Sequence, residues 1–266
     1  MSVECIHGLD DGLCDQCFPK PVPEAVAAAS GAPRRTAPAT LTATRARPKT
    51  RVAPVRTPQT RATAAAPFHV GEQRIYHLTH VRNLASILSD GELRANATPT
   101  VDISSPANRQ ARSTTTIAAG AVADYVPFFL APNSKIWELI RTDETDPRLS
   151  TDIRGAIPAN FVLLVSTVGK AGLTGSVVAD GDAIGPLTRF GTTPEYNERM
   201  LRRLHNDEVA IAAAEFLVEQ AFPFEAVTLI GVAHAKARDE VKAILAPSGY
   251  APKVSVYPPW FQRPEA

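Results

Sequence analysis

The chain has 266 residues, of which 44% are hydrophobic and 21% are charged, and its formal net charge is +1. This composition is typical of a globular protein, and the absence of any apolar run of 18 residues argues against a transmembrane helix. The N-terminus has no basic start followed by an apolar stretch, so we expect no secretory signal, no membrane partner and a cytoplasmic location.

The near-zero charge is the sum of two unlike parts of the chain. Residues 19–67 hold nine Lys or Arg and one acid, Glu24, which gives this segment a net charge of +8 and leaves −7 for the rest. The segment is rich in Pro, Ala, Thr and Arg and nearly lacks large apolar residues, so it cannot offset its ordering entropy by burial. We therefore predict a disordered basic linker, which is either a solvated tether or also a contact for nucleic acid.

All three cysteines lie in residues 1–18, in the pattern C-x-H-x6-C-x2-C. Three thiolates and one imidazole form a complete tetrahedral set for structural zinc, so the predicted ligands are Cys5, His7, Cys14 and Cys17. The alternatives are a disulfide with a spare thiol, which the missing secretory signal disfavours, and unliganded cysteines. A closed site of this kind is structural, and so short a segment would need the metal to fold.

Residues 68–266 are long enough for one domain with a sizeable core. The first predicted element is a helix that Thr79 caps and Gly91 ends, with an apolar face of Val81, Leu84, Ile87 and Leu88. Residues 124–132 indicate a strand in which Pro127 favours a sheet edge or a bulge, and residues 161–168 indicate a buried strand.

The second half of this body continues the mixture of helices and strands. Residues 169–191 carry six glycines and predict a long mobile loop, of a kind that is often functional. Residues 207–218 are ambiguous between helix and strand. The other predictions are helices over 198–204 and 236–245 and strands over 226–233 and 253–257. Without regular strand–helix alternation, the pattern indicates an α+β fold.

Several common catalytic motifs are missing from the body. It has no phosphate loop, no G-x-G-x-x-G turn, no H-E-x-x-H and no G-x-S-x-G elbow, and without a cysteine it has no thiol nucleophile. The chemistry that remains is that of His, Arg and carboxylate side chains.

Three polar clusters are candidates for that chemistry. His77 and Thr79 are two apart on a predicted strand end and so face one side, where they either bind a polar ligand or serve as a surface histidine and a cap. Residues 108–112, which end in Arg112, form a polar loop that taken alone is simply solvated. Glu215 stands against an apolar run, either as an edge acid or at a pocket floor.

Taken together, these clusters resemble a known family. The order is Y-H-L-T-H, a polar loop ending in Arg112, D-Y-V-P-F-F-L-A-P, a Gly-rich loop and A-E-F-L-V, and it is similar to the DarT family of DNA ADP-ribosyltransferase toxins. The resemblance covers about residues 74–260. It implies an ADP-ribosyltransferase-like fold with mixed central sheets and a long Gly-rich loop, and NAD as a substrate.

The resemblance also implies roles for single residues. Glu215 matches the catalytic glutamate, which closes a loop of roughly residues 169–215 that helps to hold DNA, and Arg112 matches the essential arginine. The loop before Asp124 is shorter than the family pattern, so Arg109 is a second candidate for that arginine. The implied NAD-binding set is His77, Leu78, Thr79, Ser86 and Arg94.

The implied function is transfer of ADP-ribose from NAD to a base of single-stranded DNA. Thymine is the expected base and guanine the alternative, and the expected partner is an antitoxin that removes the adduct. Two other hypotheses are the same chemistry on RNA or protein, and a non-catalytic zinc-binding adaptor for nucleic acid. The joint presence of Glu215, Arg112 and His77 argues against the adaptor, because an inert fold needs none of them.

Overall fold

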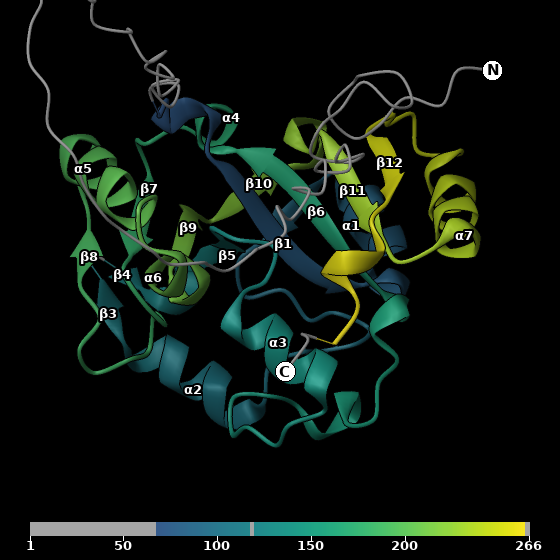
Figure 1. Ribbon diagram of the computed structural model, residues 1–266, viewed down its shortest axis with the longest axis horizontal. Coiled ribbons are helices and arrows are strands. Elements are labelled where there is room, and N and C mark those ends of the chain that lie inside the picture. Colours follow the sequence, from purple (N-terminus) through teal and green to yellow (C-terminus); the bar gives the residue numbers. More distant parts are fainter. Residues whose placement is uncertain (1–67, 118–119, 264–266) are drawn as a thin grey trace, which may run out of the picture. The chain divides into compact units, whose positions relative to one another are not determined.

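The computed structural model describes residues 68–117 and 120–263 (Figure 1). The predicted zinc ligands and the basic linker lie outside these residues. The strands are β1 (Arg74–His80), β2 (Glu92–Arg94), β3 (Thr116–Ile117), β4 (Gly120–Ala121), β5 (Tyr125–Phe129), β6 (Phe161–Thr167), β7 (Ser176–Ala179), β8 (Phe190–Gly191), β9 (Glu215–Glu219), β10 (Ala221–Pro223), β11 (Leu229–Val232) and β12 (Lys253–Val256). The helices are α1 (Leu84–Asp90), α2 (Pro106–Thr114), α3 (Lys135–Thr142), α4 (Val168–Ala171), α5 (Pro194–Leu204), α6 (Glu208–Ala213) and α7 (Ala235–Leu245).

The predicted α+β class is confirmed by one large mixed sheet of eight strands. Its order is β12-β11-β6-β1-β5-β9-β7-β8, and within it β11 and β12 pair in parallel whereas the other neighbours are antiparallel. Two small sheets, β10–β2 and β3–β4, accompany it. None of the helices in the described part of the chain is long and apolar enough to cross a membrane.

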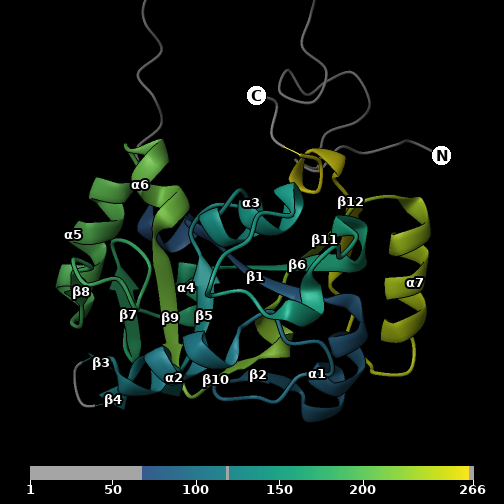
Figure 2. The same cartoon turned by 90° about the horizontal axis from the view of Figure 1, so that it is seen from below.

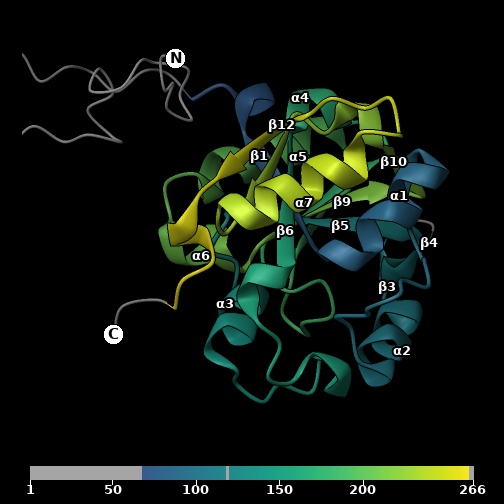
Figure 3. The ribbon, with the colours of Figure 1, turned by 90° about the vertical axis from the view of Figure 1, so that its right-hand side faces the viewer.

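Apolar side chains alternate between the two faces of the sheet, as the two-residue period of a strand requires. Along β6, Val162 and Leu164 belong to a core cluster that also takes in the buried faces of α1, α5 and α7. Phe161, Leu163 and Val165 belong to another cluster, which packs against α3. Figure 2 shows α5 beside β7 and β8 at one end of the sheet and α7 beside β11 and β12 at the other, and Figure 3 shows α7 from the side.

The predicted edge position of Pro127 is wrong, because β5 lies between β1 and β9. The register of β5 with β1 joins just Tyr76 and Phe129, whereas its register with β9 runs over all five residues of β5. The carbonyl of Pro127 faces β1, where it contacts the His77 ring. In an antiparallel pair the N and the C=O of a residue face the same neighbouring strand. The nitrogen of Pro127, which has no hydrogen to donate, therefore faces β1 at a position outside the β1–β5 register.

The predicted loop over residues 169–191 is also wrong in part. It contains most of α4, all of β7, and β8, and the irregular segment between the two strands is confined to residues 180–189. All four residues of β7 are buried, and its backbone pairs with β9 on one side and with β8 on the other. The ambiguous residues 207–218 divide into α6 and β9, with the boundary just before Glu215.

Two further local predictions need correction. Thr79 lies within β1 and does not cap a helix. The ring of His80 accepts the cap hydrogen bond instead, from the Arg82 amide. Gly91 ends α1 as predicted, with a φ of 74°. Residues 108–112 are helical, not a loop, because Ser105 caps α2 and Pro106 starts it. No residue of α2 is buried, so the helix has no apolar stripe to reveal it.

Candidate active site

A cavity of about 520 Å³ opens beside the split between β1 and β5. Its walls come from β1, α1, β2 with the loop that follows it, α2 and β5. The cavity brings together all eight residues that the family resemblance singled out in the body of the chain: His77, Leu78, Thr79, Ser86, Arg94, Arg109, Arg112 and Glu215. The three clusters that were separate in sequence are therefore one site.

Arg112 and Glu215 contact each other directly in this cavity. Arg112 Nη1 donates to Glu215 Oε2 at 3.1 Å, and the two side chains are 16% and 7% exposed. The second terminal nitrogen of the guanidinium, Nη2, is buried and has no hydrogen-bond partner among the described residues. A buried donor without a partner is costly, so Nη2 is suited to an oxygen of a bound substrate.

The other oxygen of Glu215 is held by the protein backbone. Ala183 donates its N–H to Glu215 Oε1 at 2.9 Å. The β7–β9 register pairs Ala179 with Glu215, so the chain that leaves β7 turns back over the carboxylate. Glu215 is thus a pocket acid and not an edge acid, with both oxygens oriented by hydrogen bonds.

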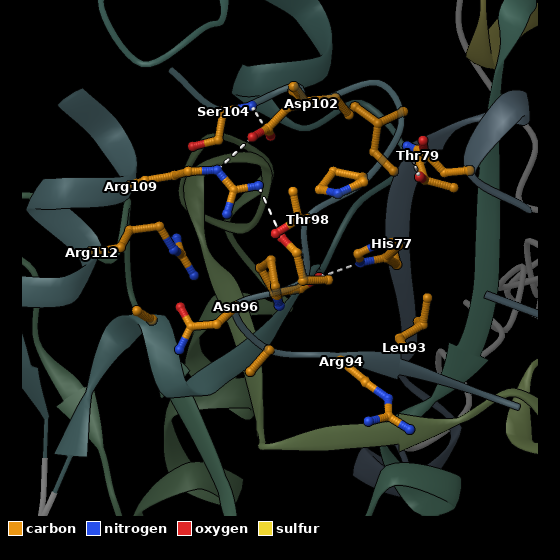
Figure 4. A pocket seen from close by; sticks show the side chains of 18 of the residues that line it. His77, Thr79, Leu93, Arg94, Asn96, Thr98, Asp102, Ser104, Arg109 and Arg112 are labelled. Atoms are coloured by element: carbon orange, nitrogen blue, oxygen red, sulfur yellow. Dashed lines mark hydrogen bonds and ion pairs between the residues drawn. The ribbon is translucent and has the colours of Figure 1, made fainter. Parts of the chain in front are cut away.

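His77 lies on the opposite side of the cavity from Arg112 (Figure 4). Its Nδ1 is 2.9 Å from the carbonyl oxygen of Pro127. Because a carbonyl only accepts, Nδ1 must carry the proton, and in the neutral ring Nε2 is then an acceptor. Burial lowers the pKa of His77, against a smaller opposite effect of the Pro127 hydrogen bond, which favours this neutral form.

Arg109 has a different task from Arg112, although both extend from α2 (Figure 4). Its Nε donates to Asp102, and its Nη2 donates to the carbonyl of Ala97 at 3.1 Å. Both partners belong to the loop between β2 and α2, which forms one wall of the cavity. The geometry therefore favours Arg112, which reaches Glu215, as the arginine at the reacting centre and assigns Arg109 to the wall.

Asn83 joins the same wall to β1. Its side chain donates to Thr79 Oγ1 at 3.1 Å and to the Val101 carbonyl at 2.9 Å, and it accepts from the Val101 amide at 2.8 Å. Ser86 donates to the Asn83 carbonyl at 2.9 Å. Arg94 is half exposed at the rim and pairs with Glu92. Sequence reasoning missed Asn83, because an asparagine ahead of a helix ordinarily indicates a cap.

Comparison with known proteins identifies the family. The family model described as "ssDNA thymidine ADP-ribosyltransferase, DarT" matches residues 76–262. The chain belongs to the DarT family. Among curated relatives, a DNA ADP-ribosyl transferase of Thermus aquaticus is 30% identical over 208 residues, which cover 71% of this chain and 89% of the relative. One from Mycobacterium tuberculosis is 26% identical and covers 69% of this chain and 86% of the relative.

Solved DarT structures have the same fold. Thermus sp. 2.9 DarT in complex with ADP-ribosylated ssDNA aligns with a TM-score of 0.59 and 25% identity, over 71% of this chain and 96% of that one. The same Thermus protein in complex with NAD+ aligns with a TM-score of 0.55 and 26% identity, over 71% and 97%. The shared region corresponds in extent to the body described here, with the large sheet and the cavity.

Proposed function

We propose that this protein transfers ADP-ribose from NAD to a ring nitrogen of thymine in single-stranded DNA and releases nicotinamide. The observation that carries the proposal is the contact between Arg112 and Glu215 inside the cavity that His77 and Thr79 line, in a chain of the DarT family. Enzymes of this class need a carboxylate near the ribose and polar groups for the rest of NAD, and the cavity supplies both.

His77, Leu78, Thr79, Ser86 and Arg94 are proposed to bind NAD. The neutral His77 ring offers Nε2 as an acceptor for a ribose hydroxyl, and the hydroxyl of Thr79 is fixed by Asn83. Arg94 at the rim supplies a positive charge for the phosphates or the adenosine end. The reacting ribose, on the nicotinamide side of NAD, is proposed to lie within reach of both His77 and Glu215.

Glu215 is proposed as the catalytic carboxylate of the transfer. When the bond between nicotinamide and ribose C1′ breaks, positive charge develops on the ribose, as it does in glycoside chemistry. An oriented carboxylate stabilises this charge and accepts a hydrogen bond from the 2′-hydroxyl. The bond that forms joins C1′ to the ring nitrogen of the base, nicotinamide leaves with the electron pair of the broken bond, and the proton of the ring nitrogen passes to solvent.

Arg112 is proposed as an electrostatic clamp in the same step. A guanidinium keeps its charge at neutral pH, so it is a poor base but a strong partner for an oxygen that gains negative charge. Its Nη2, which has no partner in the described ranges of the chain, can donate to a carbonyl oxygen of the base or to a phosphate of NAD, while Nη1 remains on Glu215. Proton loss from the base is then favoured by the charge that Arg112 supplies.

The acceptor is proposed to be single-stranded because ring nitrogens used in base pairing are hidden in a duplex. A base that is already unpaired avoids the cost of being extruded. The basic segment 19–67 is a proposed contact for the phosphates. Deleting residues 1–67 should weaken DNA binding and flatten its salt dependence but leave NAD cleavage intact, and an unchanged salt slope would overturn that role.

Two further proposals concern the rest of the chain and its partners. Cys5, His7, Cys14 and Cys17 are proposed to hold one structural zinc, and metal analysis of the intact protein should find one zinc per chain. The protein is proposed to act in the cytoplasm as the toxin of a pair, with an antitoxin that removes ADP-ribose from DNA. Expression should then arrest growth unless such an adduct hydrolase is co-expressed.

The proposed activity is tested by incubating the protein with NAD and four single-stranded oligonucleotides, each with one kind of base in its variable part. We expect a mass gain of one ADP-ribose on the thymine oligonucleotide. A mass gain on the guanine oligonucleotide alone would make guanine, and not thymine, the acceptor base. Adducts on RNA or protein without any on DNA would overturn the proposal.

A further inference from the structure

Arg148 lies between the two halves of the site, and its backbone and its side chain contact different halves. We propose that Arg148 is a positioning residue, which holds the helix of Arg112 and the turn over Glu215 at a fixed distance from each other. The inference rests on the proposed function, because it assigns Arg148 a role in that reaction.

The backbone of residues 147–149 holds the start of α2. The amide of Ser105 donates to the carbonyl of Arg148 at 2.9 Å, and the Ser105 hydroxyl donates to the carbonyl of Pro147 at 2.6 Å. A β-bridge joins Ser104 to Leu149. Since the Ser105 hydroxyl also caps α2 by accepting from the Asn108 amide, the helix that carries Arg112 begins on this segment.

The side chain of Arg148 holds the turn over Glu215. Its Nη1 donates to Asp182 Oδ2 at 2.5 Å. Asp182 in turn stabilises its own turn, because Oδ1 accepts from the Ile184 amide and its carbonyl accepts from the Thr188 hydroxyl. The next residue, Ala183, is the one whose amide fixes Glu215. A shift of Asp182 would therefore move the hydrogen bond that orients the carboxylate.

Asp146 keeps the guanidinium from turning away. Arg148 donates from Nε and from Nη2 to the two oxygens of Asp146, each at 2.8 Å, in a paired geometry. The side chains of Asp146, Arg148 and Asp182 are 16%, 25% and 29% exposed, so solvent screens them less than it screens a surface pair. The hydrogen bonds to Asp146 raise the pKa of Arg148 above its usual range; burial opposes this rise, and the hydrogen bond to Asp182 adds to it.

The same ion pair borders two cavities. Arg148 and Asp182 line the large cavity and also a second one of about 310 Å³, which α3 and α6 border and which Glu215 reaches as well. The pair is thus part of the wall shared by the two spaces. Side chains at such a wall set the position of Glu215 without having to touch NAD.

The test compares Arg148→Gln, Arg148→Lys and Asp182→Asn with the control Asp180→Asn in the full-length protein. Asp180 lies in the same β7–β8 segment, and among the described residues its side chain pairs with the exposed Arg203 and accepts from the Arg189 amide. We expect Arg148→Gln and Asp182→Asn to lower kcat for ADP-ribose transfer about 10- to 100-fold, with the KM for NAD changed less than about twofold. Arg148→Lys should restore little, because an ammonium cannot make the paired contact.

A double-mutant cycle separates positioning from a general structural effect. Glu215→Asp shortens the acid and so weakens its reach to Ala183. In that background Asp182→Asn should change the remaining rate by less than about twofold, whereas two independent effects would multiply. Melting temperatures identify any variant that fails to fold, and Asp182→Asn then carries the test without Arg148→Gln.

The inference is overturned by multiplicative effects in the cycle, by a rise of KM with kcat unchanged, or by an equal loss in Asp180→Asn. If the wild-type protein transfers ADP-ribose and the Arg148 and Asp182 variants transfer it at the same rate, this inference is contradicted but the proposed function is not. A wild-type protein that does not transfer ADP-ribose to any DNA contradicts the proposed function as well.

Discussion

Arg112 and Glu215 are 103 residues apart in the sequence and 3.1 Å apart in the structure. Each is held from a different direction: Arg112 by α2, which starts on the 147–149 segment, and Glu215 by β9 and the Ala183 amide. The pair leaves Arg112 Nη2 without a partner among the described residues, on the side where a substrate oxygen would complete its hydrogen bonds. We therefore expect substitution of either residue to lower kcat for ADP-ribose transfer.

Glu215→Gln keeps the size of the side chain and removes its negative charge. We expect kcat for ADP-ribose transfer to fall about 100- to 1,000-fold, because the charge that develops on the ribose loses its stabilising partner. NAD binding, measured by calorimetry, should change little. A variant that keeps more than half of the wild-type rate would contradict the assignment of Glu215.

Arg112 and Arg109 are separated by a matched pair of lysine substitutions. Arg112→Lys should lower kcat, because a lysine cannot contact Glu215 and a substrate oxygen together in the same planar geometry. Arg109→Lys should instead raise the KM for NAD several-fold, because it loosens the wall that Asp102 and Ala97 form with it. Steady-state kinetics on both variants checks this, and the reverse pattern would make Arg109 the arginine at the reacting centre.

His77 predicts a pH dependence of stability. Burial lowers its pKa in the folded protein, whereas in the unfolded chain it has the usual value of about 6.5. The unfolded state then binds more protons as the pH falls below about 6.5, so the free energy of unfolding decreases there until the folded-state pKa is passed. His77→Gln should flatten this part of the curve, measured by urea unfolding between about pH 7.5 and about pH 5.

The control for that measurement is His69→Gln, because His69 is exposed and should leave the curve unchanged. His80, whose pKa is also lowered by burial and by Arg82, accounts for the slope that remains in His77→Gln. A His77→Gln protein with the full wild-type slope would show that His77 is not buried in its neutral form.

Asn83→Ala should destabilise the fold and weaken NAD binding together. The substitution leaves the amide and the carbonyl of Val101 without their partner, which costs about 1–3 kcal/mol of the free energy of unfolding. The exposed Asn206, which donates to the Arg202 carbonyl, is the control, and Asn206→Ala should cost less than about 0.5 kcal/mol. Equal effects of the two substitutions on urea unfolding would contradict the role of Asn83.

The parts of the site that depend on local periodicity could be predicted from the sequence. His77 and Thr79 share a side because a strand has a period of two residues, and the structure places both in the cavity. Arg112 was singled out through the family resemblance, but its element was predicted wrongly. Helix α2 buries no residue, so it carries no apolar stripe, and the Ser105–Pro106 start was the available signal.

The parts that depend on long-range pairing could not be predicted in the same way. Pro127 indicated an edge because sequence alone does not show that β1 and β5 separate beside it. The contact of Arg148 with Asp182 joins residues 34 apart, and no local pattern distinguishes it from a solvated charge. Glycines in residues 169–191 suggested a loop, yet β7 forms there because β9 and β8 satisfy its backbone on both sides.

The most direct test of the account is mass analysis of a thymine-containing single-stranded oligonucleotide after incubation with NAD and either the wild-type protein or Glu215→Gln. The account predicts one ADP-ribose on the DNA and an equal amount of released nicotinamide for the wild type, and neither product at a comparable rate for Glu215→Gln. Unmodified DNA with the wild type, or equal modification by both proteins, would contradict it.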